Sequence, residues 1–101
     1  RVANEHLFIK PATDVYFLLA IINTLFAENS VNLGRLAEFT DGVEILREVS
    51  AEWTAEKAES MTGISAAEIR RIAREFANSK SAVCYGRMGV SVQKFGGLCQ
   101  W

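Results

Sequence analysis

Residues 14–27 constrain the fold most, because apolar side chains cover nearly every side of the helix that they predict. The apolar positions recur at three- and four-residue steps, and further apolar residues widen the stripe. Thr13 or Asp14 can cap the start of this helix. The apolar run is shorter than the roughly 20 residues that cross a bilayer. We therefore expect a buried helix and no membrane insertion.

Four further helices are predicted, over residues 33–39, 43–49, 54–62 and 66–78. The last is the clearest, because Ser65 and Glu68 have the spacing of a capping box and an apolar stripe follows them. Arginines lie largely opposite that stripe and alternate with glutamates. This pattern is typical of a solvated helix face, so we expect no nucleic-acid partner.

Two short apolar stretches predict strands. Residues 6–10 are halted by Pro11, which favours extended geometry before it. In residues 81–85 the apolar side chains are consecutive, as in a buried parallel strand. The predicted fold class is therefore α/β: one domain over residues 1–101, with two or three short parallel strands flanked by four to six helices.

Charge and glycine gather in the last quarter of the chain. Residues 77–101 hold three basic and no acidic side chains, and four of the seven glycines lie there. The whole chain of 101 residues has a net charge of only −1, which excludes a dedicated polyanion-binding protein. Glycine lets the backbone approach an anion closely, so a ligand loop and a solvated connector both fit this segment.

The sequence shows no complete catalytic site. His6 is the single histidine, and no motif links it to an acid or a nucleophile. Cys84 and Cys99 lack the CxxC pairs of metal sites and are too few for a disulfide scaffold. We expect free thiols in a reducing compartment, which favours the cytoplasm over the periplasm.

Both predicted strands end in segments suited to ligands. Residues 11–14 offer a hydroxyl and a carboxylate, and residues 86–97 form a glycine-rich loop with polar groups. In open α/β sheets, ligands bind at such strand ends. The loop has neither a Walker A sequence nor the dinucleotide GxGxxG spacing. Nucleotide-like binding is thus one hypothesis that the spacing supports.

Three stretches together resemble a known family. HLFIKPATD (6–14), WTAEKAESMTGISAAEIRRIAREFANSKSAV (53–83) and CYGRMGVSVQKFGG (84–97) resemble an internal stretch of the molybdopterin oxidoreductases. That family is the dimethyl sulfoxide reductase superfamily, which includes formate dehydrogenases and nitrate reductases. The resemblance covers essentially the whole chain. It implies a piece of a molybdenum-dependent oxidoreductase that helps to bind molybdopterin guanine dinucleotide.

The resemblance also implies residue roles. Asp14 matches the aspartate that recognises guanine, and Pro11 and Thr13 match residues that shape its turn. Four positions match the loop that lines the cofactor near its pterin end: Gly86, Met88, Gly89 and Gln93.

This sequence departs from the family pattern at two positions, one in the turn before Asp14 and one in the glycine-rich loop. Ala12 stands where the family usually has glycine, so a positive φ there would be strained. Arg87 lengthens the usual loop by one residue, and we assign it no catalytic role.

No motif here matches the family's molybdenum ligand or its iron–sulfur cysteines, so we predict no catalytic residue and no metal ligand in this chain. The missing initiator Met and a helix cut at Trp101 suggest an internal fragment. We expect the fragment to be inactive alone, to pack against the remaining domains of a parent enzyme, and to self-associate through exposed apolar surface.

A second function class stays open: a small helical protein–protein interaction module without a cofactor. The two hypotheses differ in one observation. If Asp14 and the 86–93 loop lie side by side at the ends of neighbouring parallel strands, cofactor binding is favoured; if they lie at opposite ends of the molecule, it fails.

Overall fold

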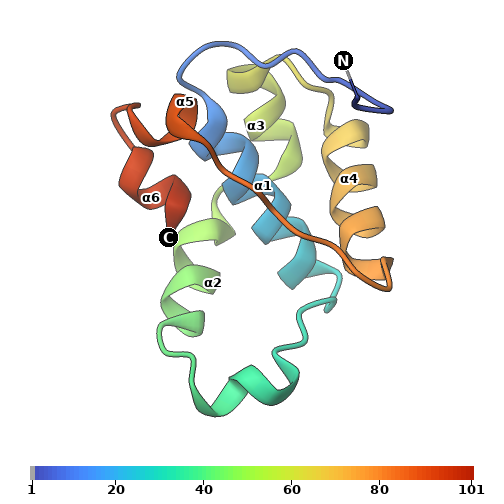
Figure 1. Ribbon diagram of the computed structural model, residues 1–101, viewed down its shortest axis with the longest axis vertical. Coiled ribbons are helices and arrows are strands. Elements are labelled where there is room, and N and C mark those ends of the chain that lie inside the picture. Colours follow the sequence, from blue (N-terminus) through green and yellow to red (C-terminus); the bar gives the residue numbers. More distant parts are fainter. Residues whose placement is uncertain (1) are drawn as a thin grey trace.

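Helix α1 (Asp14–Ala27) lies at the centre of the molecule, and α2, α3, α4 and α6 pack against it (Figure 1). The computed structural model describes residues 2–101. The elements that follow α1 are the 3-10 helix η1 (Gly34–Glu38), α2 (Val43–Ala51), α3 (Ala55–Thr62), α4 (Ala66–Asn78), α5 (Met88–Ser91) and α6 (Gly96–Gln100). The helices predicted over residues 14–27 and 66–78 are confirmed with the same bounds.

Small side chains build the core. Its buried residues are Ala20, Ala55, Ala58, Ile64, Ala66 and Ile69. Because alanine occupies little volume, the backbones of α1, α3 and α4 approach one another closely. Ile69 is the largest fully buried side chain, and it fills the space that these alanines leave. Larger, partly buried side chains pack around this cluster, namely Leu7, Ile9, Phe17 and Ile21.

Local signals set the ends of α3 and α4. The hydroxyl of Ser65 accepts a hydrogen bond from the backbone N–H of Glu68 over 3.2 Å, which confirms this half of the predicted capping box. Gly63 ends α3 with a left-handed φ of 78°, as the sequence predicts. Glu59 adds a capping contact that the sequence pattern does not show, because its carboxylate accepts from the backbone N–H of Ala66 over 2.8 Å.

The predicted α/β class is wrong, because residues 2–101 contain no strand. The 6–10 segment is extended, but its one bond to another backbone group runs from Lys10 N–H to the Thr62 carbonyl oxygen at 3.0 Å. The 81–85 segment is exposed instead of buried; Val83 is 84% exposed. A strand needs a neighbouring strand to which its backbone N–H and C=O groups can hydrogen-bond. Within residues 2–101, neither segment has such a neighbour.

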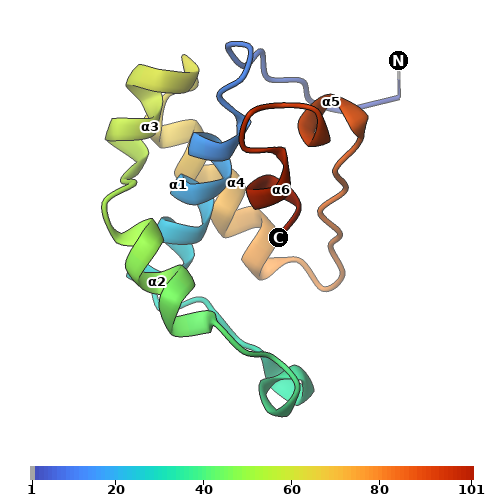
Figure 2. The ribbon, with the colours of Figure 1, turned by 90° about the vertical axis from the view of Figure 1, so that its left-hand side faces the viewer.

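The C-terminal quarter folds into two short helices: α5 lies where the sequence predicts a loop, and α6 overlaps the helix predicted at the C-terminal end. Helices α5 and α6 contact each other, and α6 returns to α1 (Figure 1). Gly96 permits this turn, because a Cβ there would lie 2.0 Å from the Ser91 carbonyl oxygen. At the other end, η1 and the start of α2 extend away from the bundle (Figure 2).

Candidate functional site

Asp14 and Gln93 meet where α5 approaches the first turn of α1. The side-chain amide Nε2 of Gln93 donates to Oδ2 of Asp14 over 2.6 Å. The same nitrogen donates to the carbonyl oxygen of Gly89 over 3.0 Å. Both side chains are half-buried. The segments that carry the predicted guanine-side and pterin-side residues are therefore in direct contact.

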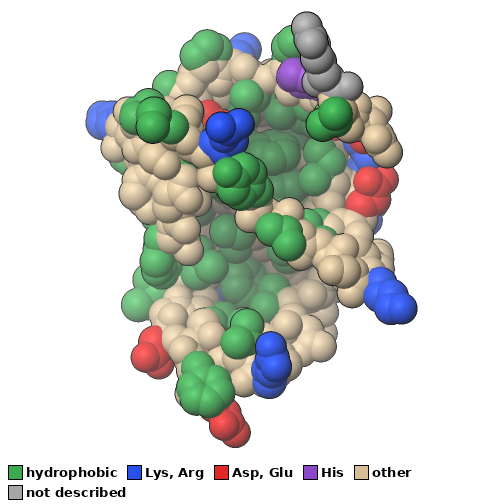
Figure 3. Space-filling model, in the orientation of Figure 1, with side chains coloured by type: hydrophobic (Ala, Val, Ile, Leu, Met, Phe, Trp, Pro, Cys, Tyr) green, Lys and Arg blue, Asp and Glu red, His purple; other side chains and the backbone are tan. Residues whose placement is uncertain are grey.

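A cavity of about 550 Å³ opens beside this pair. Its walls come from α1, α2, α4, α5, α6 and the segment between α4 and α5, and most of its lining is apolar. Figure 3 shows hydrophobic side chains gathered in this hollow. Asp14 and Gly86 both line it. A volume of several hundred Å³ with few polar groups is typical of a site for a small organic ligand.

The predicted site residues divide into two groups. Asp14, Gly86, Gly89 and Gln93 lie at the cavity or at the Asp14–Gln93 contact. Pro11, Thr13 and Met88 do not line the cavity. Thr13 shapes the preceding turn instead, because its hydroxyl donates to the Lys10 carbonyl oxygen over 2.6 Å. Met88 is 77% exposed.

Ala12 adopts a φ of 63° in that turn. This left-handed conformation is the one that glycine adopts without cost and alanine does not. The departure from the family pattern at this position therefore corresponds to local backbone strain.

The C-terminal end of the chain contributes residues that sequence reasoning missed. Cys99, Gln100 and Trp101 line the cavity. Burial, together with the negative charge of Asp14, raises the pKa of the Cys99 thiol, so the group stays protonated at neutral pH. The sequence offered little signal here, because these three residues match no motif and lie near Asp14 only through the α5–α6 turn.

Two cysteine side chains lie in this region. Cys84 and Cys99 are both free thiols that line the cavity. No three side chains of His, Cys, Asp or Glu within residues 2–101 are grouped as a metal site requires. The polar chemistry of the cavity thus rests on Asp14 and on amide and hydroxyl groups.

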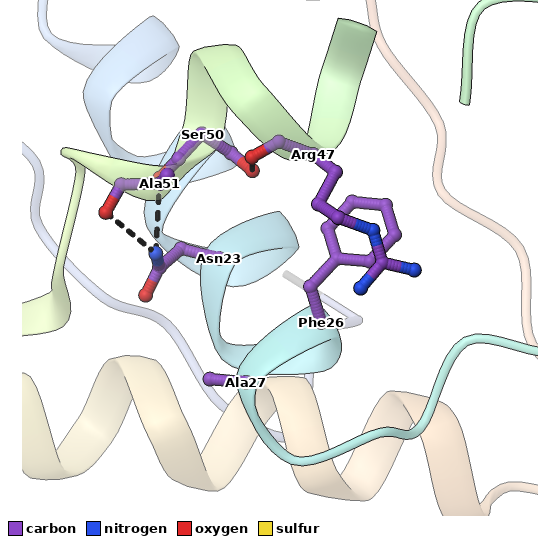
Figure 4. Close-up of a pocket in the computed structure, with 6 residues that line it drawn as sticks. All are labelled: Asn23, Phe26, Ala27, Arg47, Ser50 and Ala51. Carbon is purple, nitrogen blue, oxygen red and sulfur yellow. Dashed lines mark hydrogen bonds between the residues drawn. The ribbon is translucent and has the colours of Figure 1, made fainter. Parts of the chain in front are cut away.

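A second, smaller cavity of about 250 Å³ lies between α1 and α2 (Figure 4). Asn23 reaches across it, and its Nδ2 donates to the carbonyl oxygens of Ser50 and Ala51 over 3.0 and 3.3 Å. Arg47 lies over the Phe26 ring at 4.5 Å from its centroid. These contacts give hydrogen bonds to two carbonyl oxygens at the end of α2 and hold α1 and α2 together, so the residues around this cavity serve the packing of the two helices.

The arginines of α4 are held by glutamates. Arg74 donates to both carboxylate oxygens of Glu28, at 2.6 to 3.0 Å. Arg70 pairs with Glu56, and Arg71 pairs with three carboxylates, including Glu5 in the N-terminal segment. The pairs with Glu5, Glu28 and Glu56 hold α4 to neighbouring parts of the chain.

No helix among residues 2–101 combines the length and apolar character needed to span a bilayer.

The chain belongs to the molybdopterin oxidoreductase family. It is 35% identical over 91 residues to formate dehydrogenase H of Escherichia coli, a match covering 90% of this chain. It is 33% identical over 91 residues to trimethylamine-N-oxide reductase of Vibrio parahaemolyticus, covering 82% of this chain. Acetylene hydratase from Pelobacter acetylenicus superimposes on 90% of the chain with a TM-score of 0.80 and 27% identity. No protein-family model matches the chain.

The matches concern a segment of much longer proteins. The chain covers 13% of formate dehydrogenase H, 11% of the reductase and 12% of the hydratase. The chain thus aligns with one segment of each of these longer proteins. The three names describe a dehydrogenase, a reductase and a hydratase.

Proposed function

We propose that this chain forms part of the molybdopterin guanine dinucleotide site of a molybdenum-dependent oxidoreductase, with Asp14 as the group that receives the guanine. Gly86, Met88, Gly89 and Gln93 lie toward the pterin end, and Pro11 and Thr13 shape the turn before Asp14. The molybdenum ligand and any iron–sulfur cluster belong to other parts of the parent enzyme. When bound, the cofactor supplies the metal centre for redox chemistry.

The contact between Gln93 and Asp14 supports this proposal most directly. The two residues belong to the two segments assigned to the cofactor, and they meet at 2.6 Å. Guanine presents N–H donors along one edge, and a carboxylate accepts two parallel donors of this kind. The Gln93 amide already makes one such N–H to carboxylate bond. This bond supports a role for Asp14 as an acceptor for planar amide-like donors.

The residues around Asp14 fit a ligand of this type. The adjoining cavity has the volume of an organic ligand site and contains Tyr85 and Trp101, whose rings can stack on a base. At Gly89 a Cβ would meet no atom within 4 Å, so packing within residues 2–101 does not demand glycine there. Close approach of a ligand to the backbone is a reason for glycine at such an open position.

A nucleotide titration tests the guanine assignment on the chain itself. GMP added to the isotope-labelled protein should shift the NMR amide signals of residues 12–15 and 86–93, whereas AMP should leave them unchanged. Adenine lacks the two-donor edge that a carboxylate binds. The Asp14→Asn variant should lose the GMP response, because an amide replaces one acceptor oxygen with a donor.

Asp41→Asn is the matched control, since Asp41 is exposed in the loop before α2. It should keep the wild-type response to GMP. Equal shifts with GMP and AMP, or an unchanged GMP response in Asp14→Asn, would contradict the proposal. The remaining domains of the parent enzyme are the proposed partners that complete the site.

A further inference from the structure

Residues 38–52 form a surface that we call the acidic arm. They contain five acidic side chains and one basic side chain. Three large apolar side chains on the arm are exposed: Phe39 by 82%, Ile45 by 60% and Val49 by 44%. The arm includes all of α2, which packs against α1, and its first residues lie at the end of the molecule that extends away from the bundle (Figure 2). Exposed apolar groups among like charges are typical of a docking surface.

Residues 80–95 form a second surface, which we call the basic strip. They contain Lys80, Arg87 and Lys94 and no acidic residue. Four large apolar side chains on the strip are between 75% and 84% exposed, and they are Val83, Tyr85, Met88 and Val92. In the view of Figure 1 the strip passes in front of α1 and continues through α5, away from the lower end of the molecule.

The arm and the strip both expose apolar side chains, and their charges are opposite. Both expose apolar side chains that burial would stabilise, and the apolar contribution is roughly 25 cal/mol per Å² buried. The strip is positive and the arm is negative, so their approach is favourable, whereas two strips or two arms repel. Within one copy neither surface covers the other, because the apolar side chains of both remain exposed.

We propose that the acidic arm of one copy of this chain docks on the basic strip of a second copy. The contact is heterologous, since it joins two different surfaces, and each copy therefore keeps one free arm or one free strip. Association continues head to tail into longer chains or a closed ring. The strip includes the residues assigned above to the pterin end of the cofactor, so this contact and cofactor binding use the same segment of the chain, although the contact itself is tested without the cofactor.

Two single variants test whether the contact joins the arm of one copy to the strip of another. Ile45→Asp removes an apolar side chain from the arm, and the first turn of α2 accepts an acidic residue. Val92→Asp removes an apolar side chain from the strip and repels the arm. Sedimentation velocity between about 10 and 500 μM should show wild-type mass rising with concentration, while each variant alone stays at the monomer mass.

An equal mixture of the two variants gives the decisive result. The Ile45→Asp copy keeps an intact strip, and the Val92→Asp copy keeps an intact arm, so one wild-type contact forms between them. The mixture should reach the mass of two copies and no more. Ala67→Asp, on the exposed first turn of α4, adds the same charge elsewhere and should associate like the wild type.

Three results would overturn the proposal. They are a monomeric wild type across the whole concentration range, a mixture that stays monomeric, and a variant that associates fully by itself. The last result would indicate a symmetric contact through one surface alone. Far-ultraviolet circular dichroism of each variant confirms that its helices are retained before masses are compared.

Discussion

The side-chain amide of Gln93 donates to the Asp14 carboxylate over 2.6 Å, and this bond joins residues 79 positions apart in the sequence. A hydrogen bond to a charged acceptor is stronger than one between neutral groups. Asp14 belongs to the first turn of α1, while Gln93 follows α5. The bond therefore helps to hold the α5–α6 unit against the central helix.

Gln93→Glu should loosen the α5–α6 unit from α1. A second carboxylate at this position cannot donate to Asp14 and repels it at neutral pH. We expect a loss of about 1–3 kcal/mol in the free energy of unfolding, with faster amide hydrogen exchange over residues 88–100.

Gln100→Glu is the matched control for this change. Gln100 donates to the Ser91 hydroxyl over 2.9 Å. A hydroxyl can reverse its role and donate to a carboxylate, so this variant should stay close to wild type. Equal destabilisation by both variants would contradict a specific role for the Asp14 contact.

Helices were predictable from the sequence because their signals are local. The α4 stripe and the cap at Ser65 lie within one segment and determine its bounds without distant contacts. Strands depend on partners far away in the chain. The apolar run at residues 81–85 indicated burial, but no described segment pairs with it, and Val83 is exposed.

The candidate site was predictable only in part, for the same physical reason. Family resemblance supplied Asp14 and Gln93, and the structure brings these two into contact. Cys99 and Trp101 line the same cavity because α6 folds back on α1. That return depends on the turn between α5 and α6, which no periodic pattern encodes.

Gly96→Ala should disrupt the turn between α5 and α6. Its Cβ would lie 2.0 Å from the Ser91 carbonyl oxygen, which is backbone and cannot rotate away. We expect a loss of about 2 kcal/mol or more in the free energy of unfolding, measured by urea denaturation.

Gly97→Ala provides the contrast one residue later in α6. A Cβ at this position meets no atom within 4 Å. Replacing a helical glycine by alanine stabilises a helix by up to about 1 kcal/mol. A neutral Gly96→Ala variant would show that the turn has room that the structure does not show.

Ala12→Gly should stabilise the protein, although glycine usually weakens a chain. Ala12 has a φ of 63°, and relief of left-handed strain is worth about 1–2 kcal/mol. The larger backbone entropy of glycine in the unfolded state costs about 0.5–1 kcal/mol. The expected net gain is about 0.5–1 kcal/mol in the free energy of unfolding by urea denaturation.

The same substitution in a helix should have the opposite sign. Ala77 is exposed in α4, and Ala77→Gly should cost about 1 kcal/mol. Destabilisation by both glycine variants would indicate that the Ala12 turn carries no strain.

Acid should weaken the contacts between α4 and its neighbours. Hydrogen bonds from arginines hold the pKa of Glu28, Glu56 and Glu68 below the usual glutamate value. A carboxyl whose pKa is lower in the folded state stabilises fully above its unfolded pKa of about 4.3 and loses that stabilisation as the pH falls through the folded value. The temperature of the unfolding midpoint should therefore decrease as the pH falls below about 4.5. In high salt this decrease should be less steep, because salt screens exposed ion pairs.

Two variants separate the contribution of the Arg74 pair. Glu28→Gln should make the decrease at low pH smaller, whereas Glu52→Gln should leave it unchanged, because Glu52 forms no ion pair within residues 2–101. Identical pH profiles for wild type and Glu28→Gln would show that the Arg74 pair adds nothing to stability.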